Sequence, residues 1–205
     1  MYTGIVQGTE KVKAIELSAG YSILQITNTQ GFFDDVATGA SVAVNGVCLT
    51  VTGFDGEHAR FDVSRLTAET TTLQHLLAGD VVNIERSCRA GSENGGHSLY
   101  GHVEGVARVK SITPDGLTQK LMISVPADKM KYFFDKGFIG LHGCSLTIHH
   151  ADRENNTLTL NLIPETLRLT TLQYLKPGDL VNYEVEQSTR AIVETILNTL
   201  SAHTH

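Results

Sequence analysis

The chain has 205 residues, of which 41% are hydrophobic and 19% charged, and its formal net charge at pH 7 is -6. This acidic balance, without a basic stripe to neutralise phosphates, argues against nucleic-acid binding. No apolar run approaches the roughly 20 residues of a membrane span, and the first residues lack the basic flank and apolar core of a signal peptide. We therefore expect a protein that is neither exported nor bound to membrane or nucleic acid.

The cysteines and histidines indicate the redox compartment of the protein and whether it has a metal site. Cys48, Cys88 and Cys144 contain no CxxC pair, and an odd number of cysteines is a poor disulfide framework. A reduced, cytoplasmic protein is the expectation. The nine histidines cluster most closely between residues 142 and 150, but no HExxH or matched Cys/His spacing accompanies them. The sequence predicts no metal site.

Taken along the chain, the sequence repeats itself. Three blocks return in the same order, namely residues 4–15 as 101–112, 42–51 as 139–148, and 71–85 as 170–184. Six of twelve positions are identical in the first pair, and ten of fifteen in the third. The chain length fits two small domains, so we predict a duplicated domain that builds two similar ligand pockets. The predicted boundaries are residues 1–97, 98–187 and a tail at 188–205.

Within each copy the strand signals dominate. Short alternating or β-branched runs predict strands at residues 41–45, 48–52, 60–63, 81–85, 157–162 and 180–185. Asn45-Gly46 and Asp55-Gly56 are hairpin dipeptides, and His142-Gly143 occupies the place of the first in the second copy. Many short strands with turn signals predict an all-β protein with one small closed barrel per copy. Short helices are plausible near residues 66–77 and 166–175.

The tail has a different pattern. From residue 189 to about 201, five apolar side chains fall on one face of a helix, namely Ile192, Val193, Ile196, Leu197 and Leu200. An amphipathic helix beyond two complete repeats needs a surface to cover its apolar stripe. The pattern leaves open whether that surface is its own barrel or another subunit.

Comparison of the two copies singles out candidate site residues. Thr50 and Thr147 are equivalent, so a hydroxyl faces the same place in both copies. The copies differ where Cys48 corresponds to Ser145, where His102 corresponds to Ile5, and where Lys136 corresponds to Gly39. Each has a structural alternative: a strand cysteine is often a core residue, the Gly-rich linker with His97 and His102 can be a plain join, and Lys136 can be a solvated turn residue.

Motifs along the whole chain resemble the riboflavin synthase family, α-chain type. They lie at residues 1–8, 45–51, 95–103, 136–140, 145–148 and 162–167. The resemblance implies tandem Greek-key barrels, with the terminal helix helping to hold a homotrimer. It also implies a dismutation in which two molecules of 6,7-dimethyl-8-ribityllumazine yield riboflavin and 5-amino-6-ribitylamino-uracil, with no cofactor and no metal. Each barrel would bind one lumazine, and the reacting pair would form between the first barrel of one subunit and the second barrel of a neighbour.

The resemblance also implies the site residues. The first site would comprise Gly4, Ile5, Val6, Cys48, Leu49, Thr50, Asp62, Val63, Ser64, Arg65, Leu66 and Thr67. The second would comprise Ser145, Leu146, Thr147, Leu162, Ile163, Pro164, Glu165, Thr166 and Leu167. Gly101, His102, Val103 and Lys136 would lie at the join. The catalytic candidates are Cys48, His102, Ser145 and Lys136: Cys48 and His102 would assist proton transfer and nucleophilic addition, while Ser145, with Thr147, would orient the partner ring.

Four positions depart from the family pattern. Tyr2 replaces a usual Phe and Glu186 a usual Asp, whereas Leu66 stands for Glu and His142 for Asp. The family includes non-catalytic lumazine proteins that act as optical antennae, which is the alternative function. Retention of Ser145, Thr147, Lys136, Cys48 and His102 favours the enzyme.

Overall fold

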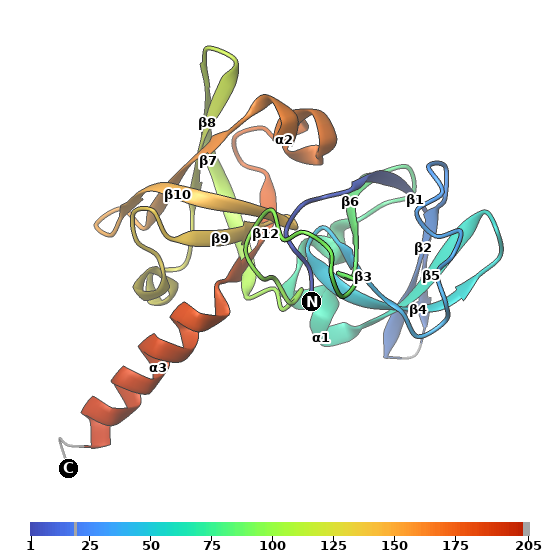
Figure 1. Cartoon of the computed structure of the whole chain (residues 1–205), viewed down its shortest axis with the longest axis horizontal. Helices are drawn as coiled ribbons and strands as arrows, with labels where there is room; N and C mark the ends of the chain where they lie inside the picture. The colour runs from blue at the N-terminus through green and yellow to red at the C-terminus, as the bar shows by residue number, and fades with distance from the viewer. Residues whose placement is uncertain (19, 203–205) are drawn as a thin grey trace.

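The computed structural model describes residues 1–18 and 20–202, which form two closed antiparallel barrels lying side by side (Figure 1). The first barrel has the strand order β1-β2-β5-β4-β3-β6. Its strands are β1 (Gly8–Ser18), β2 (Tyr21–Thr27), β3 (Ser41–Val44), β4 (Val47–Phe54), β5 (His58–Ser64) and β6 (Val81–Arg86). The predicted all-β tandem-barrel fold is confirmed.

The second barrel repeats this topology in the order β7-β8-β11-β10-β9-β12. Its strands are β7 (Gly105–Asp115), β8 (Thr118–Ser124), β9 (Phe138–Leu141), β10 (Cys144–Asp152), β11 (Thr157–Leu162) and β12 (Leu180–Val185). Each barrel encloses its own apolar core, with Phe33 and Phe61 fully buried in the first and Phe133 in the second. No described helix is long and apolar enough to cross a membrane.

The helices are shorter than the sequence predicts. The expected helix at 66–77 is α1 (Arg65–Thr70) followed by the 3₁₀ turn η1 (Thr72–His75), and that at 166–175 is α2 (Pro164–Leu169) followed by η3 (Thr171–Tyr174). In both copies a threonine between the two pieces has an extended backbone and caps the second piece with its side chain. A further 3₁₀ turn, η2 (Ala127–Tyr132), joins β8 to β9.

The barrels meet across a pseudo-twofold interface at their β3–β4 and β9–β10 turns. Both turns have left-handed backbones, and a Cβ on Gly46 would lie 2.6 Å from the backbone nitrogen of Gly143. Asn83 donates from Nδ2 to the carbonyl of His142 at 2.9 Å, and Asn182 donates to the carbonyl of Asn45 at 2.9 Å. The copies thus contact each other through equivalent residues.

This interface explains the departure at His142. In the first copy the Asn45 side-chain oxygen accepts the backbone N–H of Asn83 at 2.8 Å. In the second, Nδ1 of His142 accepts the backbone N–H of Asn182 at 3.0 Å. Burial lowers the pKa of His142 to about 4, so the ring is neutral and can accept this hydrogen bond. The histidine therefore supplies an interface acceptor and does not alter a ligand pocket.

Helix α3 (Gln187–Ala202) projects away from the second barrel (Figure 1). The Glu186 carboxylate accepts the backbone N–H groups of Ser188 and Thr189 at 2.9 and 2.7 Å, so this departure acts as a helix cap. Arg190 forms an ion pair with Glu104, and Val193 packs on the second core. The base of the helix thus docks on its own barrel.

Farther along α3 the apolar stripe stays exposed. The exposed fractions are 60% for Ile192, 53% for Ile196 and 40% for Leu197. Each of the two alternatives for this helix therefore applies to one part of it. The base packs on the chain's own barrel, and the outer apolar stripe is available to another surface.

Candidate functional site

The leading segments of the two copies are exchanged between the barrels. Gly4 accepts the backbone N–H of Ser145 at 2.8 Å, and Gly101 accepts that of Cys48 at 3.1 Å. Both glycines have a φ of +73°, and a Cβ on either would lie 2.5 Å from the Cβ of its partner. The predicted grouping is therefore wrong: residues 4–6 lie against the second barrel and residues 101–103 against the first. Spacing along the repeat could not show this crossing.

Two buried carboxylates anchor these segments. Glu85 on β6 accepts N–H groups of Thr3 and Gly4 at 2.7 and 3.1 Å, and Glu184 on β12 accepts those of Tyr100 and Gly101 at 2.8 and 3.0 Å. Burial raises the pKa of Glu85 and that of Glu184, although these hydrogen bonds oppose the rise. Each glutamate holds the segment that leaves its own barrel for the other.

In the first site, strand alternation decides which predicted residues can face a ligand. On β4, the Thr50 side chain points outward and Cys48 is half-buried, whereas Leu49 is 4% exposed and belongs to the core. On β5, Asp62 points outward and Val63 points into the core. Leu49 and Val63 can therefore offer only backbone atoms to a ligand.

The start of α1 completes this first group. Ser64 caps the helix by accepting the backbone N–H of Thr67 at 3.1 Å, which brings two hydroxyls together at the end of β5. Arg65 forms an exposed ion pair with Glu69 at 2.7 Å, and Leu66 is 74% exposed. No carboxylate stands at the Leu66 position, whereas the equivalent residue of the second copy is Glu165.

Tyr2 lies between the barrels rather than on an open ligand surface. It is 2% exposed, pairs with Leu99 in an antiparallel bridge, and donates its hydroxyl to the Cys48 sulfur at 3.1 Å. Burial, followed by the hydrogen bond to Cys48, raises the pKa of Tyr2, so the phenol keeps its proton. The hydroxyl that distinguishes Tyr2 from the usual Phe is therefore bound within the protein.

The second site has two adjoining cavities of about 160 and 330 Å³. Ser145, Ile163 and Thr166 line both. Gly4, Ile5, Val6 and Glu165 line the first; Lys136, Leu146, Thr147 and Asn161 are among the residues that line the other. Because Lys136 lines this cavity with Ser145 and Thr147, it lies with the second group of residues rather than at the join; its backbone is left-handed, with φ +67°.

Several predicted residues of this site also have structural roles. Leu162 is fully buried, Leu146 is 8% exposed, and Leu167 packs against the second core. Pro164 occupies the first turn of α2, where its missing N–H is no loss. Glu165 pairs with Arg168 at 2.6 Å, which lowers the pKa of this exposed carboxyl.

The linker residues His97, His102 and Val103 lie in different surroundings. The His102 side chain is exposed, with its ring 6.0 Å from that of Tyr100, and follows the Gly101 contact to Cys48. Val103 packs against the first core. His97, which the sequence pattern assigns to neither site, has its Nδ1 2.6 Å from the Ser145 hydroxyl. The Gly95-Gly96-His97 motif was the only sequence signal for the contact between His97 and Ser145.

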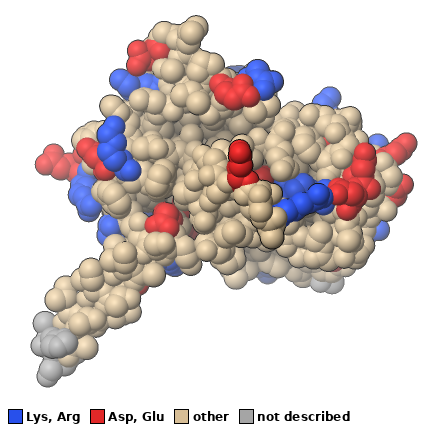
Figure 2. Space-filling view, viewed as in Figure 1, with Lys and Arg blue, Asp and Glu red and all other residues tan. Residues whose placement is uncertain are grey.

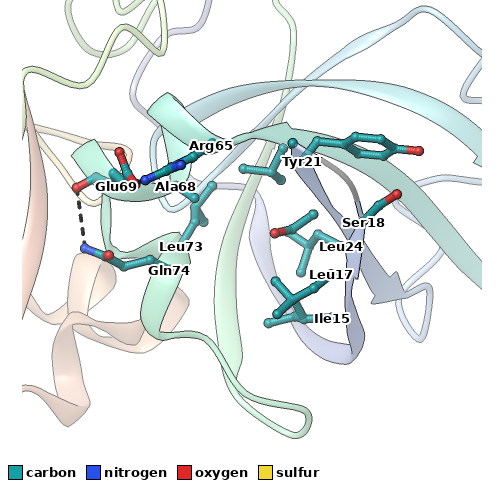
Figure 3. A pocket seen from close by; sticks show the side chains of 13 residues that line it. Ile15, Leu17, Ser18, Tyr21, Leu24, Arg65, Ala68, Glu69, Leu73 and Gln74 are labelled. Atoms are coloured by element: carbon teal, nitrogen blue, oxygen red, sulfur yellow. Dashed lines mark hydrogen bonds and ion pairs between the residues drawn. The ribbon is translucent and has the colours of Figure 1, made fainter.

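A separate cavity of about 340 Å³ opens under α1 (Figure 3). It is lined mainly by apolar side chains, with Ile15, Leu17 and Tyr21 opposite Ala68 and Leu73. Val63 and Arg65 of the first predicted group line it, whereas Cys48, Thr50 and Gly101 do not. Among residues 1–18 and 20–202, no group of three or more His, Cys, Asp or Glu side chains could hold a metal ion.

Comparison with known proteins matches both barrels. The Lumazine binding domain family matches residues 3–87 and again 100–186. Riboflavin synthase of Escherichia coli K12 is 39% identical over 203 residues, covering 98% of this chain and 94% of that protein, and the Schizosaccharomyces pombe enzyme is 36% identical, covering 91% and 89%. Among solved structures, LumP complexed with riboflavin has a TM-score of 0.82 at 32% identity, covering 90% of this chain and 99% of that one.

Proposed function

Because the chain belongs to the lumazine-binding family that includes the riboflavin synthases, we propose that it is a riboflavin synthase, a transferase acting on 6,7-dimethyl-8-ribityllumazine. Two lumazine molecules react, one giving a four-carbon unit to the other, to form riboflavin and 5-amino-6-ribitylamino-uracil. The observation that carries this proposal is the duplication of the barrel, each copy of which matches the lumazine-binding family.

The two sites bind like molecules but present different chemistry. Thr50 and Thr147 offer equivalent hydroxyls, while Cys48 stands in one site where Ser145 stands in the other. The first site combines outward residues of β4 and β5 with His102, and the second combines Ser145 and Thr147 with Lys136. Cys48 and His102 assist proton transfer and nucleophilic addition, whereas Ser145 and Thr147 orient the partner ring. Holding two rings in register supplies about 7–11 kcal/mol of the barrier reduction in favourable cases.

The reacting pair forms between subunits of a homotrimer, with the first barrel of one subunit facing the second barrel of its neighbour. Helix α3 supports this assembly: Ile192, Ile196 and Leu197 are exposed, and the sequence has no Lys, Arg, Asp or Glu after Glu194. Figure 2 shows the outer part of the helix as an arm with almost no Lys, Arg, Asp or Glu on that face. Three unpaired cysteines agree with a cytoplasmic location.

The alternative is an antenna protein that binds a lumazine or flavin without turnover. The solved LumP structures at 30–32% identity and the loss of a carboxylate at Leu66 favour it. The intact second site, with Ser145, Thr147, Lys136 and two adjoining cavities, favours the enzyme instead.

Incubation of the purified full chain with 6,7-dimethyl-8-ribityllumazine decides between the two. We expect many riboflavin molecules per subunit, and a joint replacement Cys48→Ala with His102→Ala should reduce kcat by about 10²-fold or more. Cys88→Ala, a half-buried cysteine outside both sites, is the matched control and should leave kcat unchanged. A fluorescent complex without turnover would support the antenna, and unchanged turnover of the double variant would refute the roles of Cys48 and His102.

A further inference from the structure

The linker before the second barrel is built to reach Ser145. A Cβ on Gly96 would lie 2.2 Å from the carbonyl oxygen of Thr3 and 2.8 Å from the Cβ of Ser145. Only glycine lets the chain pass through this gap, because any side chain would overlap backbone atoms. The next residue, His97, is thereby placed directly over Ser145.

His97 contacts the Ser145 hydroxyl twice. Its backbone N–H donates to Oγ at 3.1 Å, and its ring Nδ1 lies 2.6 Å from the same atom. The ring is stacked on Phe138 with centroids 5.0 Å apart and planes at 19°, and the residue is 8% exposed. Backbone, stacking and burial therefore fix the imidazole against the hydroxyl.

The protonation state follows from this burial. Burial lowers the pKa of His97, although the Glu186 carboxylate opposes the change, so the ring is neutral at neutral pH. A neutral imidazole has one accepting nitrogen. The other nitrogen, Nε2, is buried and has no hydrogen-bond partner among the described residues. A buried unpaired nitrogen is costly, and such exceptions call for a functional explanation.

Ser145 faces the cavities of the second site, whereas His97 lines neither of them. Ser145 lines both cavities together with Ile163 and Thr166. Since Oγ already accepts the His97 backbone N–H, donation of its hydrogen to Nδ1 leaves one lone pair free for the cavity. The opposite arrangement, Nδ1–H donating to Oγ, would leave the hydroxyl hydrogen free to point at the ligand instead.

We propose that His97 is a positioning residue that accepts the Ser145 hydroxyl hydrogen and so holds Oγ as a hydrogen-bond acceptor toward the lumazine in the second site. The proposal rests on the proposed function. In the first site the equivalent Cys48 receives a hydrogen from Tyr2. The Cys48 sulfur thus only accepts from its neighbour, whereas Ser145 Oγ accepts the His97 backbone N–H and also donates to the His97 ring. The two sites therefore differ in polarity although they bind the same molecule.

A double-mutant cycle on the full chain tests this. His97→Ala should lower kcat by about 10- to 100-fold while KM changes by less than about 3-fold. In a Ser145→Ala background the same replacement should change kcat by less than about 2-fold, because the partner through which His97 acts is gone. His97→Asn, whose Oδ1 stands near the place of Nδ1, should recover most of kcat. Equal losses in both backgrounds would mean a packing role and would overturn the proposal.

A second measurement needs no turnover and no variant. The ¹⁵N shifts of the imidazole in unliganded protein should show hydrogen on Nε2 and none on Nδ1 at neutral and mildly basic pH. Hydrogen on Nδ1 would overturn the proposal even if the protein is a synthase. Conversely, absence of riboflavin formation by the unsubstituted protein would refute the proposed function, while the tautomer would still decide the His97–Ser145 polarity.

Discussion

Acidification should weaken this protein through His142, and His142→Asn should remove that weakness. In the folded chain the buried ring has a pKa of about 4, whereas an unfolded histidine titrates near 6.5. Above pH 6.5 both states are neutral and the stabilising hydrogen bond from Asn182 is complete. As the pH falls from 6.5 toward 4, only the unfolded chain gains the proton, so unfolding becomes progressively easier.

The magnitude follows from the interval. Each unit of pH between the two pKa values is worth about 1.4 kcal/mol, so lowering the pH from 7 to 5 should cost about 2 kcal/mol through this residue. Asparagine at 142 would keep an acceptor for the Asn182 N–H, as Asn45 does for Asn83, and would not titrate. The variant should match the parent at pH 7 and exceed it by about 2 kcal/mol at pH 5.

Urea unfolding at pH 7 and pH 5, at one protein concentration, measures this difference. All other titrating groups are common to parent and variant, so their contributions cancel in the comparison. Asn45→His is the mirror control: it places a second histidine at the equivalent turn and should roughly double the loss. If the parent and His142→Asn lose the same free energy between pH 7 and 5, the ring is not held neutral by burial and the reasoning fails.

Two other predictions follow from the fold. Gly46→Ala should destabilise the protein by about 2 kcal/mol or more in thermal unfolding, because a Cβ would meet the Gly143 backbone at 2.6 Å. Gly56→Ala is the control: its φ is +96° but the space around it is open, so it should cost only about 1 kcal/mol. Equal costs for the two variants would refute the steric argument. If the chain forms the proposed trimer, Ile196→Glu should dissociate it in sedimentation velocity while each subunit stays folded. Thr195→Glu is the control on the same exposed helix, and a trimer that survives Ile196→Glu would place the contact elsewhere.

Much of the fold could be predicted because the repeat and the turn chemistry agree. The hairpin turns at Asn45-Gly46 and His142-Gly143 adopt the left-handed backbones that their residues favour. The long strands β1 and β7 were not predicted, since bulges between Val12 and Ala14 and between Val109 and Ser111 interrupt the alternation that reveals a strand. The bulges recur at the same offset as the sequence blocks.

The sequence predicted which strand side chains face outward at the two sites, but not which chain segments come together there. Cys48, Thr50, Ser145 and Thr147 point where alternation along a strand requires. Which copy receives the Gly4 and Gly101 segments depends on how the barrels face each other, and a single repeat contains no information about that packing. His142 illustrates the same limit: a nonconservative change in sequence is a conservative exchange of acceptors once the facing Asn182 N–H is known.

The crossing of residues 4–6 and 101–103 means that the chain is, in effect, a domain-swapped dimer joined into one polypeptide. An excised fragment ending at residue 97 would retain the first barrel but lack the Gly101 segment that covers Cys48. Two such fragments could restore each other only by trading their own leading residues. A single-barrel ancestor would therefore have needed a partner before it had a complete pocket, and fusion of two copies made that partnership permanent.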